Sequence, residues 1–280
     1  MRKTTLTIFF CTILFLGQGQ IRLSLPFTSA YDEDATVLLG IQYNYVNQNY
    51  QLALKKDWQS YAIDYPGDNI NDINGLKSIH SYNSHGFSVG IPMDIRTNAN
   101  LYLTFNPSFL FINNSGIVYT GTDPLSTDFA PKSLIRRTRH LETSTNGTNF
   151  NAFEFPLSIK YRSDEKIFKN KFNRYRGYVA GGLRYTRFIG IAGEYEGLLK
   201  ERQNTPIPQS LIWKIDYPSW EVGLGVDIFF PYFKMSPEIK FNQSFGSVLD
   251  HEHPLAAGNK FMAPIEKGLI RNIYVSLIFQ

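Results

Sequence analysis

The sequence has almost no cysteine, little excess charge and no long apolar run inside the chain. Cys11 is the only cysteine among 280 residues, and the formal net charge is only +4. No internal apolar run reaches the roughly 18 residues that a membrane-spanning helix requires. The composition therefore excludes a disulfide-stabilised scaffold and internal helical membrane spans, and it gives no indication of a nucleic-acid partner.

The N-terminus has the parts of a secretory signal peptide. Arg2 and Lys3 form a basic start, residues 6–16 form a short apolar core that contains the cysteine, and a glycine-containing stretch follows as a cleavage site. We therefore expect residues 1–19 to be removed and residues 20–280 to form one domain. That mature domain would contain no cysteine, so disulfides and thiol chemistry are not expected in it.

Aromatic residues are abundant and indicate strands. Tyrosine and phenylalanine account for 17 and 22 residues, and both types favour strands and membrane interfaces. The clearest strands lie between Trp220 and Phe245, where apolar and polar residues alternate in two arms around a corner at Pro231 and Tyr232. A period of two gives each arm one apolar and one polar face, so this stretch is predicted to be a β-hairpin.

Strands of this kind recur about eight times along the chain, although the facing of the glycine-rich one at residues 175–188 is ambiguous. The predicted strands cover residues 37–45, 86–95, 101–111, 153–161, 175–188, 220–230, 233–245 and 269–280. Long polar connections between them alternate with short or medium turns, as in outer-membrane β-barrels. Strands of about 11–13 residues, at roughly 3.3 Å per residue and a tilt near 40°, can cross the ~25 Å lipid band. We predict an all-β, about eight-stranded antiparallel transmembrane barrel with long extracellular loops, short periplasmic turns and outer-membrane lipid around it.

The polar faces of these strands support a filled lumen. They are rich in Gly, Ser and Asn and carry a few charges of both signs, and buried ions must pair. We expect a lumenal charge network made of Glu154, Lys160, Arg176, Arg184, Glu221, Asp227, Glu238 and Lys240. The alternative is a soluble barrel whose apolar faces surround a small ligand. The direction in which the apolar faces point distinguishes the two.

Four prolines fall inside predicted strands, at Pro92, Pro107, Pro156 and Pro237. Proline cannot donate a ladder hydrogen bond, and a closed barrel has no edge where this loss is harmless. We therefore expect a bulge or a lost ladder bond beside at least two of them.

Two basic segments stand out between the strands. The run Lys132, Arg136, Arg137 and Arg139, in the second long connection, is interpreted as a solvated loop face. The turn of residues 163–174 should lie on the periplasmic side, either as a solvated basic turn near anionic headgroups or as a docking site for an acidic periplasmic partner. The residues of that docking hypothesis are Lys166, Lys169 and Lys171.

Catalytic signatures are weak. His251 and His253 have the chemistry of metal ligands, but a metal site needs three or four converging groups and the sequence shows no partner set. A hydrolase at the barrel rim would need an Asp and His set that cannot be assembled from the sequence. We therefore expect no catalytic residues, no metal and no cofactor, with a rim enzyme as the alternative.

Several segments resemble the PorT (SprT) family. They are residues 155–162, 178–182, 231–241 with the Asp-His-Glu-His sequence that follows at 250–253, and the terminal residues 275–280. The resemblance implies a non-enzymatic outer-membrane protein of Bacteroidetes that is required for type IX secretion and, in gliding species, for motility. It implies other type IX secretion components as partners. The family has no established catalytic residues, so none are transferred to this chain.

Overall fold

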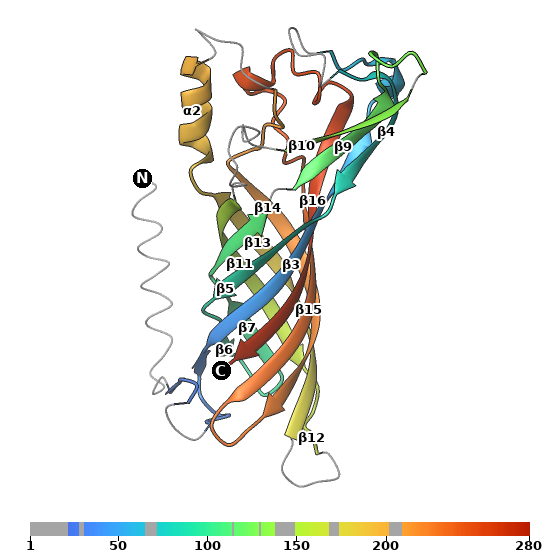
Figure 1. Cartoon of the computed structure of the whole chain (residues 1–280). Helices are drawn as coiled ribbons and strands as arrows, with labels where there is room; N and C mark the ends of the chain where they lie inside the picture. Colours follow the sequence, from blue (N-terminus) through green and yellow to red (C-terminus); the bar gives the residue numbers. More distant parts are fainter. Residues whose placement is uncertain are drawn as a thin grey trace.

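The computed structural model describes residues 22–27, 31–64, 72–113, 115–128, 130–137, 149–167, 174–201 and 209–280. The predicted signal peptide lies outside these residues. The main body is an antiparallel β-barrel that stands upright in Figure 1. No helix within the described part of the chain has both the length and the apolar character needed to cross a membrane.

Eight positions form the barrel wall, and two of them consist of broken strands. In order they are β3 (Ile41–Leu54), β5 with β6 (Ser84–Gly90, Met93–Arg96), β7 with β8 (Leu101–Phe105, Ser108–Asn113), β11 (Asn149–Arg162), β13 (Arg174–Phe188), β14 (Asp216–Phe229), β15 (Lys234–Ser244) and β16 (Ile265–Phe279). Neighbouring positions pair antiparallel, and the pairing of β16 with β3 closes the barrel. The predicted fold class is confirmed.

The apolar face of each strand points outward. On β14 and β15, Val222, Leu224 and Ile239 are 47%, 64% and 63% exposed, whereas Asp227 and Lys240 are at most 5% exposed. A water-soluble barrel would bury the first three and expose the last two, because burial of apolar surface drives its folding. The soluble ligand-binding alternative is therefore wrong, and this chain is an outer-membrane β-barrel protein.

Three of the four in-strand prolines lie side by side in the wall and interrupt its hydrogen-bond ladders. Pro92 lies between β5 and β6, and Pro107 lies between β7 and β8. Opposite them, β11 pairs with neither β7 nor β8 at Pro156. The pairing of β14 with β15 is also interrupted beside the fourth proline, Pro237. The expected loss of ladder bonds is confirmed, because none of these residues has an amide hydrogen to donate.

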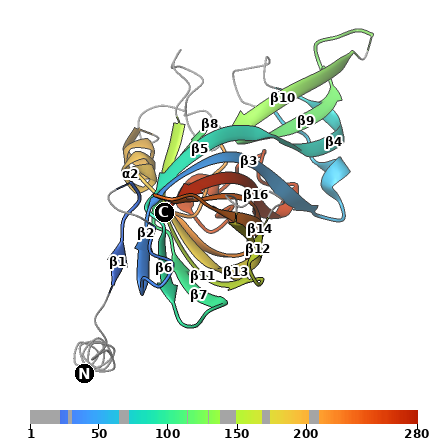
Figure 2. The same cartoon turned by 90° about the horizontal axis from the view of Figure 1, so that it is seen from below.

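The extracellular end is more ordered than the prediction of long polar loops implied. β4 (Asn74–Tyr82), β9 (Gly116–Thr122) and β10 (Pro131–Arg137) form a second sheet that projects to one side of the barrel in Figure 2. α2 (Ile191–Glu201) and the short 3-10 helices η1 (Trp58–Ser60) and η3 (Pro254–Ala256) complete this end. Here apolar side chains point inward and form a core, as in a water-soluble protein. Tyr119, Trp213 and Phe261 are buried in it among aliphatic side chains.

The basic run in this region is not a solvated loop face throughout. Arg136 is buried on β10, and its guanidinium lies 4.2 Å from the centre of the Phe261 ring. The expectation was wrong for Arg136, because the strand directs its side chain toward the apolar core. Lys132 lies 3.4 Å from Asp123, and Arg139 falls outside the described residues.

The N-terminal segment covers the periplasmic end. β1 (Leu23–Ser24) pairs parallel with β2 (Val37–Leu39), which pairs with β6 at the barrel rim (Figure 2). The backbone N–H of Tyr31 donates to the carbonyl of Pro231 at 2.9 Å, so the strap of residues 31–38 is fixed to the β14–β15 corner. At the lower end of Figure 1, β12 (Lys166–Ile167) pairs with the start of β13.

Candidate functional site: a closed, charged lumen

The inward positions of the strands build an upper cluster of charges around Arg184. Its guanidinium lies 2.8 Å from a Glu154 oxygen and 2.6 Å from a Glu221 oxygen, and it stacks 4.1 Å from the centre of the Tyr274 ring. The Tyr274 hydroxyl donates to Glu154 at 2.6 Å, and the Ser158 hydroxyl donates to Glu221 at 2.6 Å. Each of the two carboxylates in this group is therefore held by the Arg184 guanidinium and by a hydroxyl donor.

Lys240 extends the upper cluster toward the periplasm. Its ammonium lies 3.3 Å from Glu221 and 3.1 Å from Glu238. The upper cluster, Glu154, Arg184, Glu221, Glu238 and Lys240, thus has three carboxylates and two cations.

A lower cluster lies nearer the periplasmic mouth. The Lys160 ammonium is 2.8 Å from Asp94, and Arg162 is 2.7 Å from Asp227. Lys234 lies between the two carboxylates, 3.5 Å from Asp94 and 3.8 Å from Asp227. This cluster has three cations and two carboxylates, so the surplus charges of the two clusters cancel.

In the part of the chain that the structure describes, side chains fill the lumen, and it is not open as a channel. Asp94, Thr104 and Lys160 are among the side chains around a cavity of about 10 Å³, which is room for about one water molecule. Above it lies the apolar core, and below it Tyr102 stacks 3.9 Å from the Arg162 guanidinium. An eight-stranded barrel is narrow enough for side chains to fill it, and these side chains do so.

The structure places seven of the eight predicted lumenal residues in these clusters. The eighth, Arg176, lies at the periplasmic mouth instead, 2.9 Å from Glu33 and 3.6 Å from Glu165. Its position near the start of β13 puts it beyond the filled lumen. The sequence reasoning missed three members, which lie at inward positions at or beyond the ends of the predicted polar faces: Asp94, Arg162 and Lys234.

Ion pairs also hold the strap across the periplasmic mouth. Asp34 lies 2.7 Å from Arg96, and Glu33 contacts Arg174 at 3.3 Å in addition to Arg176. The hydrogen bond from Arg96 lowers the pKa of the exposed Asp34 carboxyl below its usual value. Burial raises the pKa of the Tyr31 hydroxyl well above its ordinary value, so Tyr31 stays neutral at the start of the strap.

The basic turn is described only in part. Lys166 is exposed on β12, whereas Lys169 and Lys171 lie outside the described residues. Docking of an acidic partner at this turn stays a prediction.

The two histidines of the last extracellular connection, His251 and His253, pack within the loop structure. His253 accepts a hydrogen bond from the backbone N–H of Leu255 at 3.2 Å, and its ring centre lies 5.0 Å from that of Tyr195. Burial lowers the pKa of His251 below its usual value. Within the described ranges, no group of three or more His, Cys, Asp or Glu side chains could hold a metal ion.

Comparisons with known proteins give similarity of fold alone. No protein-family model and no curated protein matches this sequence. Among solved structures, the attachment invasion locus protein Ail of Yersinia pestis is 9% identical with a TM-score of 0.32, over 86% of this chain and 96% of that one. Neisserial surface protein A is 10% identical with a TM-score of 0.35, over 86% of this chain and 95% of that one. The barrel assignment rests on the strand pairing and burial described above.

Proposed function

We propose that this chain is a non-enzymatic outer-membrane β-barrel protein that serves type IX secretion as a component or assembly factor. The proposal starts from the resemblance of several segments to the PorT (SprT) family. The position of residues 231–241 in the fold supports it, because this segment is the one most similar to the family. This hairpin holds the strap through Pro231 and supplies Lys234, Glu238 and Lys240 to the lumen. The segment most similar to the family thus helps to fill the lumen and to hold the strap at the periplasmic mouth.

A closed barrel favours a role as a scaffold over a role as the export channel. The buried charge clusters fill the lumen, and the strap and the apolar core cover its two ends. An interior filled in this way by the described side chains leaves no path for a folded or extended cargo chain. The proposed contribution therefore lies at the faces of the barrel, where it would contact other secretion components.

Deletion of the gene tests this function. We expect proteins that bear a C-terminal type IX signal domain to accumulate in the periplasm, and gliding to be lost in a gliding host. Complementation with the full chain should restore both, while an outer-membrane protein that does not use this route serves as the control. Normal export of the cargo in the deletion strain would contradict the proposal.

A further inference from the structure

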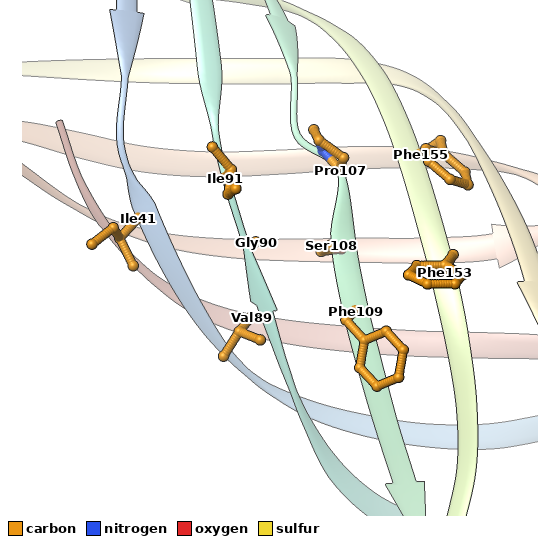
Figure 3. Close-up of a pocket in the computed structure, with 9 residues that line it drawn as sticks. All are labelled: Ile41, Val89, Gly90, Ile91, Pro107, Ser108, Phe109, Phe153 and Phe155. Atoms are coloured by element: carbon orange, nitrogen blue, oxygen red, sulfur yellow. The ribbon is translucent and has the colours of Figure 1, made fainter. Parts of the chain in front are cut away.

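The outer wall of the barrel carries an apolar groove where the prolines break the strands. Its volume is about 580 Å³, within the roughly 300–1,000 Å³ of sites that hold small organic ligands. Figure 3 shows Ile41, Val89 and Ile91 on one flank and Phe153 and Phe155 on the other. Gly90 lies between Val89 and Ile91 on their strand, and Pro107, Ser108 and Phe109 lie on the next strand, between the two flanks.

The interrupted ladders explain why a depression forms here. The second and third wall positions both break at this height, so regular pairing is replaced by single contacts such as Ile91 N–H to Pro107 O at 3.0 Å. The floor is tightly packed from within, because a Cβ added at Gly90 would lie 2.8 Å from the Asn106 side chain and 2.9 Å from Ser108 Cβ. The lumenal side chains behind the groove therefore leave no space for a larger residue at position 90.

A row of aromatic rings stiffens one side of the groove. Phe109 contacts Phe153 with 5.1 Å between ring centres, and Phe153 and Phe155 are 6.4 Å apart. The row continues through Phe111 and Phe87, with centres 4.6 Å apart at each step. Interlocked rings of this kind hold their positions better than isolated side chains facing lipid.

The position of the groove identifies the medium that it faces. Its flanking side chains belong to the outward apolar band, with Ile41 and Ile91 more than 60% exposed. Toward the extracellular end, the outward positions become polar at Asn47 and at the exposed His85, which contact each other at 3.2 Å. The groove thus lies within the hydrocarbon band, on the periplasmic side of this polar edge.

We propose that this groove binds one phospholipid acyl chain of the surrounding membrane. Carbon atoms form its walls, and the Ser108 hydroxyl beneath it already donates to Glu154 at 3.2 Å, so an occupant that needs hydrogen bonds finds no partner. A flexible hydrocarbon chain fits both the chemistry and the volume. The aromatic row immobilises the chain, which distinguishes this lipid from the others around the barrel.

Lipid retention by the folded chain tests the site. The mature protein is folded into phosphatidylcholine nanodiscs and released into detergent. Native mass spectrometry then measures the mass of the protein with any lipid that it retains. We expect one retained phosphatidylcholine per chain in the unaltered protein and its loss in Val89→Trp, which fills the groove. Ile91→Trp provides a second filling variant. Val222→Trp, at an exposed apolar position on the opposite wall, is the matched control and should retain the lipid.

Three results would overturn the proposal. The first is that the unaltered protein retains no lipid, and the second is that both filling variants retain it while migrating as folded barrels. The third is retention that appears only when lipopolysaccharide is added to the nanodiscs, which would assign the groove to a different lipid. Cross-linking from a photoreactive residue at position 91 in cells should label lipid, and a protein adduct there would also count against the acyl chain.

Discussion

Replacement of Arg184 by methionine should destabilise this barrel more than any exposed substitution. The guanidinium is buried between Glu154 and Glu221, at 2.8 and 2.6 Å. Without it, the upper cluster keeps three carboxylates and only one cation, so the two clusters together carry one uncompensated negative charge inside the lumen. Removing one partner of a buried ion pair costs about 3–5 kcal/mol. We expect the free energy of unfolding to fall by an amount of this order.

The measurement is reversible urea unfolding of the mature chain in phosphatidylcholine vesicles, followed by tryptophan fluorescence and by the mobility of folded and unfolded barrels on gels. Arg187→Met is the control, because Arg187 lies on the same strand with an exposed side chain and should change stability by at most about 1 kcal/mol.

A double-mutant cycle separates the charge effect from lost packing. In Arg184→Met with Glu221→Gln, one surplus negative charge is removed, so part of the lost stability should return. If Arg184→Met is no more harmful than Arg187→Met, or if the second substitution makes it worse, the lumenal pairs do not stabilise the barrel as described.

Three further predictions concern other parts of the chain. Gly182→Ala should destabilise the barrel by about 1–3 kcal/mol in the same urea assay, because its Cβ would lie 2.1 Å from a backbone oxygen of Leu157, whereas Gly181→Ala, with its nearest atom at 3.8 Å, should be close to neutral. His251 has a lowered pKa in the folded state, so the unfolded chain binds its proton more readily, and stability should fall as the pH drops through its ordinary value of about 6.5; His251→Gln should lose this part of the pH dependence of unfolding. Reversal of charge in the basic turn should reduce retention of an acidic periplasmic partner in pull-downs, and unchanged retention would eliminate docking by Lys166, Lys169 and Lys171.

The membrane-spanning part of the fold could be predicted because the side of the wall that a residue faces depends on its position within its own strand. Ile239 and Lys240 are neighbours in sequence and face opposite sides of the wall, so alternation alone assigns one to lipid and the other to the lumen. The direction of the faces followed from the small residues between the charges. The breaks at Pro92 and Pro107 followed from the chemistry of one residue type.

The extracellular sheet could not be predicted with the same rule. Its strands lie in segments rich in polar residues, and burial of Ile117 and Tyr119 depends on contacts with distant parts of the chain such as Phe261. Arg136 illustrates the difficulty, because a basic run indicates solvent unless an aromatic partner from elsewhere covers it. Likewise, Arg176 has the inward parity of a lumenal residue, but the height at which the lumen ends is set by how the strands tilt.

The two kinds of ion pair in this barrel differ in how easily a partner could disturb them. The lumenal pairs are almost fully buried, so separating them leaves charges without compensation at a cost of several kcal/mol. The pairs that hold the strap, such as Asp34 with Arg96, are exposed to water, which screens their attraction, so they stabilise the structure far less. A partner that binds the periplasmic face competes with these weak contacts while the lumen stays intact. This difference in strength supports an action at that face rather than through the interior.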